Sequence, residues 1–316
     1  IVDGKTMATK HMSELLEKTE EVRTWGEGMS RYLPKQVKLF SDGAVFSQLM
    51  QLSEGYLDGH HGEWIMEPDV FQAAFKKYWD AGYQIHVHQN GDAGLDMVLD
   101  TLEANLTRNP RENHRTVIVH FSYSRSDQIQ RIKDLGAVVS VNPYYPVALA
   151  DMYSEVGVGP ERSHSMVRLG ELEKAGVSYS LHSDMPMAPG QPLYLMWCAV
   201  NRITHNGNVV APEQSITATQ ALRAITLDAA YSMQLDEEIG SIEPGKFANV
   251  TVLQSNPLTV APETIKDIQV AATIHEGRVF NVNKLLDDSS LGDNTNNVTL
   301  PQLAGVYVDL ILEKIF

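Results

Sequence analysis

The chain has 316 residues, a formal net charge of −15 and a pI near 5.1. Hydrophobic residues make up 43% and charged residues 21%, which is the composition of a globular protein with a sizeable core and excludes a disordered chain. The acidic balance disfavours nucleic acid and anionic membrane surfaces as partners, because both require a basic surface. We therefore expect a small-molecule partner.

Cys198 is the single cysteine, so no intrachain disulfide can form and a thiolate-rich metal site is excluded. No apolar run approaches the ~18 residues that cross a bilayer. The first residues, IVDGKTMATK, contain neither an initiator Met nor an apolar signal segment. The compartment, cytoplasmic or periplasmic, therefore stays open.

Strand-like and helix-like segments alternate in the first part of the chain, after a helix-prone stretch at 12–30. The strand-like segments are bounded by Gly, Asn or Pro, and they are residues 36–40, 85–88, 116–121, 137–143 and 177–184. The helical segments between them are residues 69–82, 92–106, 126–136 and 165–176. This alternation predicts right-handed βαβ units and a parallel sheet of the α/β class.

The sequence pattern changes from helical to β-rich after two further helical segments, 191–203 and 217–233. Residues 239–254 and 268–282 are β-rich and contain the turn signals Pro244-Gly245 and Glu276-Gly277. The predicted organisation is therefore an α/β unit over 1–234, a small β unit over 235–285 and a tail over 286–316 that contains a helix candidate.

Polar side chains gather at the ends of the predicted strands. The C-terminal ends of parallel strands form one open edge, where functional residues collect. The strand-end residues of this kind are Lys38, His86, His88, His120, Asn142, His182 and Asp184. Two or three imidazoles and a carboxylate at one edge can hold a metal such as zinc and activate a water molecule.

The histidines differ in how well they suit a ligand role. His86 and His88 are two residues apart, so they share one face of a strand at different depths. His88 is nearer the strand end and is the preferred ligand, whereas His86 is expected to pack deeper. His120 alone would fit a structural, hydrogen-bonded role, and only its place in the set favours a ligand.

Other candidates allow two interpretations each. Asp184 either caps the turn that follows it or binds metal and takes a proton from the attacking water. Lys38 either pairs with a carboxylate such as Asp42 or reacts with carbon dioxide to become an oxygen ligand. His60 and His61 lie in a Gly-rich connection that either touches the substrate or is an exposed loop.

Several of these segments together resemble the amidohydrolase superfamily, and specifically amidohydrolase family 3, which includes YtcJ-like and N-substituted formamide deformylase-like proteins. The resemblance covers roughly residues 30–285. It is carried by segments such as VKLFSDG, YLDGHHGEW, HVHQNGDAGLDMVLDTLE, LHSDMPMAPGQPL and IGSIEPGKFANVTVLQ.

The resemblance implies a metal-dependent (β/α)8 barrel, with strands four to eight in this chain, and a small β-sandwich. It implies that Lys38 is the strand-four lysine, commonly carboxylated, that His88 and His120 bind one or two divalent ions, expected to be zinc, and that Asp184 binds metal and shuttles the proton. We expect the substrate to contact the neighbouring residues His60, His61, Asn142 and His182.

One feature of the family is missing. Members begin with a strand-one His-X-His pair, and nothing before Lys38 fits it. If residues 86–88 were that pair, too few residues would follow them for a barrel of ~250 residues and a β domain. We therefore expect the chain to be the C-terminal portion of a longer enzyme, completed by an N-terminal segment or a partner chain, with a homo-oligomer also open.

The sequence leads to one preferred hypothesis, hydrolysis of an amide-type C–N bond by metal-activated water. The joint presence of Lys38, His88, His120 and Asp184 favours it. The alternative is a non-catalytic or incomplete homologue that serves as a binding or assembly module, which the missing His-X-His pair favours. A metal-free lyase or isomerase on the same barrel is a further enzymatic alternative.

Overall fold

The computed structural model describes residues 1–25 and 32–281. The helix predicted in the tail 286–316 lies outside the described residues, and so does the last part of the helix-prone stretch 12–30. In the described part of the chain, no helix has the length and apolar character that crossing a membrane requires.

The described residues contain a parallel sheet in which neighbours along the chain are neighbours in space. Its six strands are β1 (Val2–Asp3), β2 (Gln36–Phe40), β3 (Gln84–Gln89), β4 (Val117–His120), β5 (Val138–Val141) and β6 (Tyr179–Leu181). Five coincide with the strands expected from the sequence. The addition is β1, which pairs Val2 with Val37 and Asp3 with Lys38. A strand of two residues is too short to show a periodic pattern.

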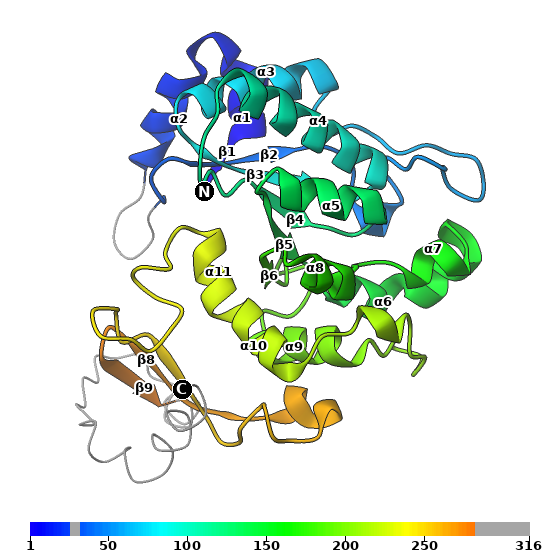
Figure 1. Cartoon of the computed structure of the whole chain (residues 1–316), viewed down its shortest axis with the longest axis vertical. Helices are drawn as coiled ribbons and strands as arrows, with labels where there is room; N and C mark the ends of the chain where they lie inside the picture. The colour runs from blue at the N-terminus through cyan, green and yellow to red at the C-terminus, as the bar shows by residue number, and fades with distance from the viewer. Residues whose placement is uncertain (26–31, 282–316) are drawn as a thin grey trace.

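Helices surround the strands in chain order. They are α1 (Gly4–His11), α2 (Leu15–Arg23), α3 (Pro68–Asp80), α4 (Asp92–Arg108), α5 (Ser126–Asp134), α6 (Tyr144–Met152), α7 (Pro160–His164), α8 (Leu169–Ala175), α9 (Pro192–Asn201), α10 (Ala218–Ile225) and α11 (Leu227–Ser232). Figure 1 shows α3, α4, α5, α8, α9 and α10 following one another around the outside of the sheet. This curvature leaves the sheet with an outer, helix-covered face and an inner face.

Strand alternation decides which residues lie on the inner face. Val37 and Leu39 are completely buried in the core against the helices. Lys38 and Phe40 therefore face the other way, because side chains alternate along a strand. Parallel pairing of Lys38 with His86 and of Phe40 with His88 places these two histidines on the inner face as well.

The lower end of the inner face is closed by the end of α11, which Figure 1 shows on the side of the strands away from α4 and α5. The Nε2 atoms of Gln36 and Gln84 donate to the carbonyls of Met233 and Ser232, at 2.7 and 2.9 Å. Tyr231 packs on a small apolar cluster of the inner strands, made of Val117, Val119 and Val138. The end of α11 therefore covers the part of the inner face where the strands begin.

A separate antiparallel sheet lies in the second unit. It consists of β7 (Val250–Leu253), β8 (Val270–His275) and β9 (Arg278–Asn281). The 3-10 turn at 262–267 joins this unit to α9, where the indole of Trp197 donates to the Glu263 carbonyl at 3.0 Å and Lys266 lies over the Trp197 ring. The boundary predicted near residue 235 stays a prediction.

Arg202 offers a test of the packing between α9 and its neighbours. Its guanidinium is buried and donates to four backbone carbonyls, those of His164, Met166, Val167 and Val210. Arg202→Met should lower the free energy of unfolding by at least ~3 kcal/mol, because these carbonyls lose their donors inside the protein. The exposed ion pair of Arg108 with Asp80 provides the control, and Arg108→Met should cost less than ~1 kcal/mol. Equal midpoints in urea unfolding would contradict this account.

Candidate functional site

Three histidines meet where the strands of the inner face end. The rings of His88 and His120 have centroids 4.5 Å apart, and those of His120 and His182 are 5.0 Å apart. His182 Nε2 lies 3.1 Å from His120 Nδ1, and His182 Nδ1 lies 2.9 Å from the Ser140 hydroxyl. We call His88, His120 and His182 the histidine cluster. His182, expected to touch substrate, is therefore an integral member of it.

An unusual backbone conformation brings His120 into this cluster. His120 pairs with Gln89, one position beyond the pair formed by Val119 and His88. By strand alternation its side chain would face away from His88. His120 instead has a φ of 82°, and Phe121 has a φ of 53°. This left-handed conformation costs a non-glycine residue ~1 kcal/mol or more, and such strain is concentrated at functional sites.

Burial keeps the cluster uncharged. It lowers the pKa of His88 and of His182 to about 3, and the positive charge of Lys38 contributes in the same direction. The pKa of His120 lies well below its ordinary value, again because of burial first and neighbouring His88 second. At neutral pH these imidazoles therefore offer lone pairs instead of repelling a cation.

The tautomer of His88 follows from its neighbour Asn90. The Asn90 Nδ2 atom donates to His88 Nε2 at 3.0 Å and to the Gly43 carbonyl at 3.1 Å. Because an amide nitrogen only donates, His88 Nε2 is the acceptor and its Nδ1 carries the proton. The Asn90 amide therefore occupies the lone pair of His88 Nε2 in this structure. The sequence alone indicated no role for Asn90.

Lys38 lies on the inner face beside the cluster. Burial lowers its pKa, while the charges of Asp184 and Asp3 act in the opposite direction. The interpretation that Lys38 pairs with Asp42 is wrong, because the Asp42 carboxylate accepts hydrogen bonds from Ser41, Gln51, Asn90 and Gly91. A lysine with a lowered pKa is more readily neutral, which is the form that reacts as a nucleophile.

Asp184 follows β6 at the same edge of the sheet. It is exposed and has a φ of 55°, another left-handed conformation at a non-glycine residue. Its charge acts on Lys38 and also contributes to the raised pKa of Tyr145, which burial raises most. Tyr145, at the start of α6, is a neighbour of the site that no sequence pattern indicated.

The side chain of Asn142 forms hydrogen bonds to the protein backbone. It is completely buried, and its Nδ2 donates to the Ser183 carbonyl at 3.3 Å while its Oδ1 accepts from the Tyr144 amide at 3.1 Å. These bonds hold the loop that leads to Asp184. The expectation that Asn142 contacts substrate stays a prediction, and its observed contacts are those of a support.

His60 and His61 lie in the rim loop, which we define as residues 41–67. The His60 ring stacks on Tyr56 at 4.1 Å, with Nδ1 at 2.5 Å from Asp58 Oδ1 and Nε2 at 2.7 Å from the Gln48 carbonyl. His61 is exposed. His60 therefore bonds to residues of its own loop. Among the described residues, neither His60 nor His61 contacts the histidine cluster.

His86 lies two residues before His88 on β3, so its side chain is on the same inner face but farther from the strand end. It is 3% exposed, and its Nε2 has no hydrogen-bond partner among the described residues. Burial, with a contribution from Lys38, lowers its pKa to about 3. His86 is thus a neutral imidazole with an unused polar atom close to Lys38.

The donor chemistry fits a divalent metal in part. His88 and His120 are neutral, adjacent imidazoles, and Lys38 lies beside them. Within residues 1–25 and 32–281, however, no group of three or more His, Cys, Asp or Glu side chains is arranged to hold a metal ion. The role of Asp184 as a ligand beside these histidines therefore stays a prediction.

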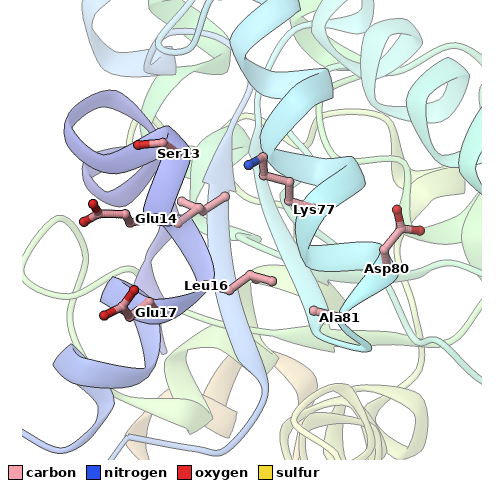
Figure 2. A pocket seen from close by; sticks show the side chains of 8 residues that line it. Ser13, Glu14, Leu16, Glu17, Lys77, Asp80 and Ala81 are labelled. Atoms are coloured by element: carbon pink, nitrogen blue, oxygen red, sulfur yellow. The ribbon is translucent and has the colours of Figure 1, made fainter.

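A surface groove of ≈470 Å³ lies elsewhere, between α2 and α3 (Figure 2). Its wall includes the charged residues Glu14, Glu17, Lys77 and Asp80. Lys77 donates to the Met12 carbonyl at 3.0 Å. The groove contains none of the predicted site residues and lies among the outer helices, so it is not part of the candidate site.

Comparisons with known proteins place these features in a family. Residues 3–280 match the profile of the amidohydrolase family. The chain is 32% identical over 197 residues to N-substituted formamide deformylase of Arthrobacter pascens, which covers 62% of this chain and 36% of that protein. It is 31% identical over 224 residues to LONG AFTER FAR-RED 3 of Arabidopsis thaliana, which covers 70% of this chain and 38% of that protein.

A solved structure shows the same fold. A metal-dependent hydrolase from Pyrococcus horikoshii OT3 matches with a TM-score of 0.64 and 28% identity, covering 79% of this chain and 50% of that chain. The matches confirm the resemblance and the predicted α/β barrel class. The chain spans between 36% and 50% of the lengths of these three proteins.

The rim loop should respond to pH through His60. Both ring nitrogens face acceptors, so only the protonated ring donates both bonds, and these bonds to Gln48 and Asp58 raise the pKa of His60. Because the folded-state pKa lies above the unfolded value, this stabilisation is complete below the unfolded pKa of ~6.5 and is lost as pH rises through the folded pKa.

Hydrogen exchange of the loop amides should therefore accelerate, beyond the intrinsic rate, as the pH rises above the unfolded histidine pKa of ~6.5 in the wild-type chain. In His60→Gln this additional pH dependence should disappear. His61→Gln changes the exposed neighbour and should behave like the wild type. The same pH dependence in the wild type and His60→Gln would contradict the role of His60.

Proposed function

Because the chain belongs to the amidohydrolase family, we propose that it carries part of the active site of a metal-dependent hydrolase that cleaves a C–N bond of the amide type. The observation that carries the proposal is the pairing of His88 and His120, two neutral imidazoles held at adjacent strand ends beside Lys38. The P. horikoshii relative, described as a metal-dependent hydrolase, supports a metal in this place.

His88 and His120 would hold a divalent ion, which we expect to be zinc. When bound, such an ion supplies Lewis acidity toward a carbonyl oxygen and lowers the pKa of a water molecule. The protein contributes imidazoles that need not lose a proton first, because burial already keeps them neutral. The left-handed backbone conformation of His120 turns its imidazole toward His88.

Lys38 would supply an oxygen ligand after reaction with carbon dioxide. The neutral amine attacks the carbon atom, a C–N bond forms, and one proton leaves the nitrogen, so that an anionic carbamate results. Its lowered pKa and its place between His86 and Phe40 on the inner face favour this reaction. Asp42 does not compete for Lys38, since its own hydrogen bonds go to another set of groups.

Asp184 would move the proton. It takes a proton from the attacking water, the water oxygen bonds to the carbonyl carbon, and the same proton then reaches the leaving nitrogen as the C–N bond breaks. Its exposed position at the strand edge, within the electrostatic reach of Lys38, supports this role. N-substituted formamides are the first substrates to examine, because the A. pascens relative is named for them.

The metal assignment can be tested on the purified chain by elemental mass spectrometry. We expect near-stoichiometric zinc in the wild type and at least a tenfold loss of bound zinc in His88→Ala and in His120→Ala, since each removes a ligand. His114→Gln is the control, because His114 is a buried histidine before the start of β4, outside the cluster, where it bonds Thr116 and the Leu135 carbonyl. A wild type without metal, or variants that retain it fully, would contradict the proposal.

The role of Asp184 can be tested with an N-substituted formamide as substrate. Asp184→Asn should lower kcat by roughly 10²–10⁴-fold, because the amide cannot carry the proton. The thermal midpoint should stay close to that of the wild type, since the side chain is exposed. Asp58→Asn changes another exposed carboxylate of the rim and should retain turnover. Wild-type kcat in Asp184→Asn would exclude the proposed proton transfer.

A further inference from the structure

Large apolar side chains are exposed in the connections that follow the strand ends. Those after β2, β5 and β6 include Phe46, Leu57, Met152, Val156 and Met185. A single exposed apolar residue is common on protein surfaces and by itself indicates no function. Phe46 and Met185 differ from the others because the structure ties both to the surroundings of Asp184.

Met185 follows Asp184 directly in the connection after β6. Its side chain is 71% exposed. The Met187 amide donates to the Asp184 carbonyl at 2.9 Å, which holds the turn that carries both residues. A Cβ atom at Gly190 would lie 3.4 Å from the Met185 Sδ atom, so this thioether rests against the far side of the same connection. A methionine in such a place adapts its unbranched chain to different apolar groups.

Phe46 reaches the same area through Tyr145. The two rings meet edge to face, with centroids 5.8 Å apart and an interplanar angle of 72°. Tyr145 is buried, and its pKa is raised by burial first and by the charge of Asp184 second, so that carboxylate lies close to it. Phe46 itself is 42% exposed. One part of its ring therefore packs on Tyr145, and the rest is available for contact.

The backbone around Phe46 is held in place by the protein. Phe46 lies in the 3-10 turn Val45–Ser47, and the side chain of Val45 is buried. The Val45 carbonyl accepts a bond from the Tyr153 hydroxyl and another from the Gln48 amide, the latter at 3.1 Å. A ring on a fixed turn loses less conformational freedom when a ligand binds than a ring on a mobile one. Phe46 is thus a preformed apolar contact.

The proposed reaction determines which part of a substrate faces these residues. Asp184 would deliver the proton to the leaving nitrogen, so this nitrogen has to come within hydrogen-bond distance of the carboxylate. The substituent on the nitrogen then lies beside the neighbours of Asp184. The acyl side of a formamide carries only a hydrogen atom. The substituent on the nitrogen is therefore the group by which one formamide differs from another.

We propose that Phe46 and Met185 bind the substituent on the leaving nitrogen and select substrates in which this substituent is an apolar chain. The inference rests on the proposed function, because the role of Asp184 defines the place of the nitrogen. Each methylene group that is fully buried against apolar side chains strengthens binding by about fourfold. A charged or strongly polar substituent would instead lose part of its hydration beside Phe46.

The preference can be measured as binding, by NMR titration with N-hexylformamide and N-methylformamide. Both are added to the Asp184→Asn chain, in which hydrolysis is not expected and Asn tolerates the left-handed backbone of this position. N-Hexylformamide should bind roughly tenfold or more tightly than N-methylformamide, since its longer chain reaches the apolar side chains. Adding Phe46→Ala should lower this ratio to about twofold, with little change for N-methylformamide.

Three further variants in the same background separate a specific contact from a general effect. Phe46→Leu retains an apolar side chain and should keep most of the preference. Met185→Ala changes a more exposed side chain, so it covers the case in which Phe46→Ala does not fold, and it should lower the ratio about threefold. Phe247→Ala removes a phenylalanine that is 51% exposed and lies outside these connections, and the ratio should stay unchanged.

Three results would overturn the inference. The first is equal binding of the two formamides, and the second is an unchanged ratio in both Phe46→Ala and Met185→Ala. The third is an equal loss of the ratio in Phe247→Ala, because the longer formamide would then bind any exposed apolar side chain.

Amine release by the wild-type chain distinguishes this inference from the proposed function. If both hold, kcat/KM should favour N-hexylformamide, and Phe46→Ala should act on this substrate mainly through KM. No amine from either formamide, together with the binding preference, would contradict the hydrolysis and support the contact with Phe46. Equal kcat/KM and equal binding would support the hydrolysis and overturn the role of Phe46 and Met185.

Discussion

The histidine cluster depends on keeping imidazoles uncharged in a buried place. His88, His120 and His182 lie within ring contact, so a proton on one would face its neighbours and Lys38 without compensation. Burial removes that possibility by lowering each pKa. The Asp42 carboxylate accepts hydrogen bonds from the backbone amides of Gln51, Asn90 and Gly91 instead of pairing with Lys38.

The rest of the fold supports this arrangement from below. Gln36 and Gln84 anchor the end of α11 against the lower part of the inner face, and Tyr231 covers the valines there. The rim loop is attached at the opposite end through Asp42 and Asp92. The histidine cluster lies at the end of the inner face where the strands finish, which is where parallel α/β folds place their sites. The sheet thus contributes its helix-covered face to the hydrophobic core and the ends of its strands to the candidate site.

The sequence predicted the features that follow from strand periodicity. The segments 36–40 and 85–88 and the rule that parallel strands end at one edge were enough to bring Lys38, His88, His120 and His182 near each other. It did not predict the left-handed backbone of His120 or the partners of Asp42, because both depend on loops folding against each other from distant positions. The sequence indicated no role for Asn90, because its donor role depends on Gly43 lying beside it. Local sequence patterns therefore predicted the edge of the sheet where the site lies, whereas the contacts of His120, Asp42 and Asn90 became apparent only in the folded structure.

Two carboxylates at this edge have opposite environments, and this difference is the best guide to their roles. Asp42 is completely buried, and four hydrogen bonds hold it while burial raises its pKa to about 6. A group so fully bonded cannot exchange protons without disrupting three segments, so it suits positioning. Asp184 is exposed on a strained turn, and its charge reaches Lys38. When two carboxyl groups of one site are separated in this way, the free one is suited to proton transfer and the bonded one to holding the structure.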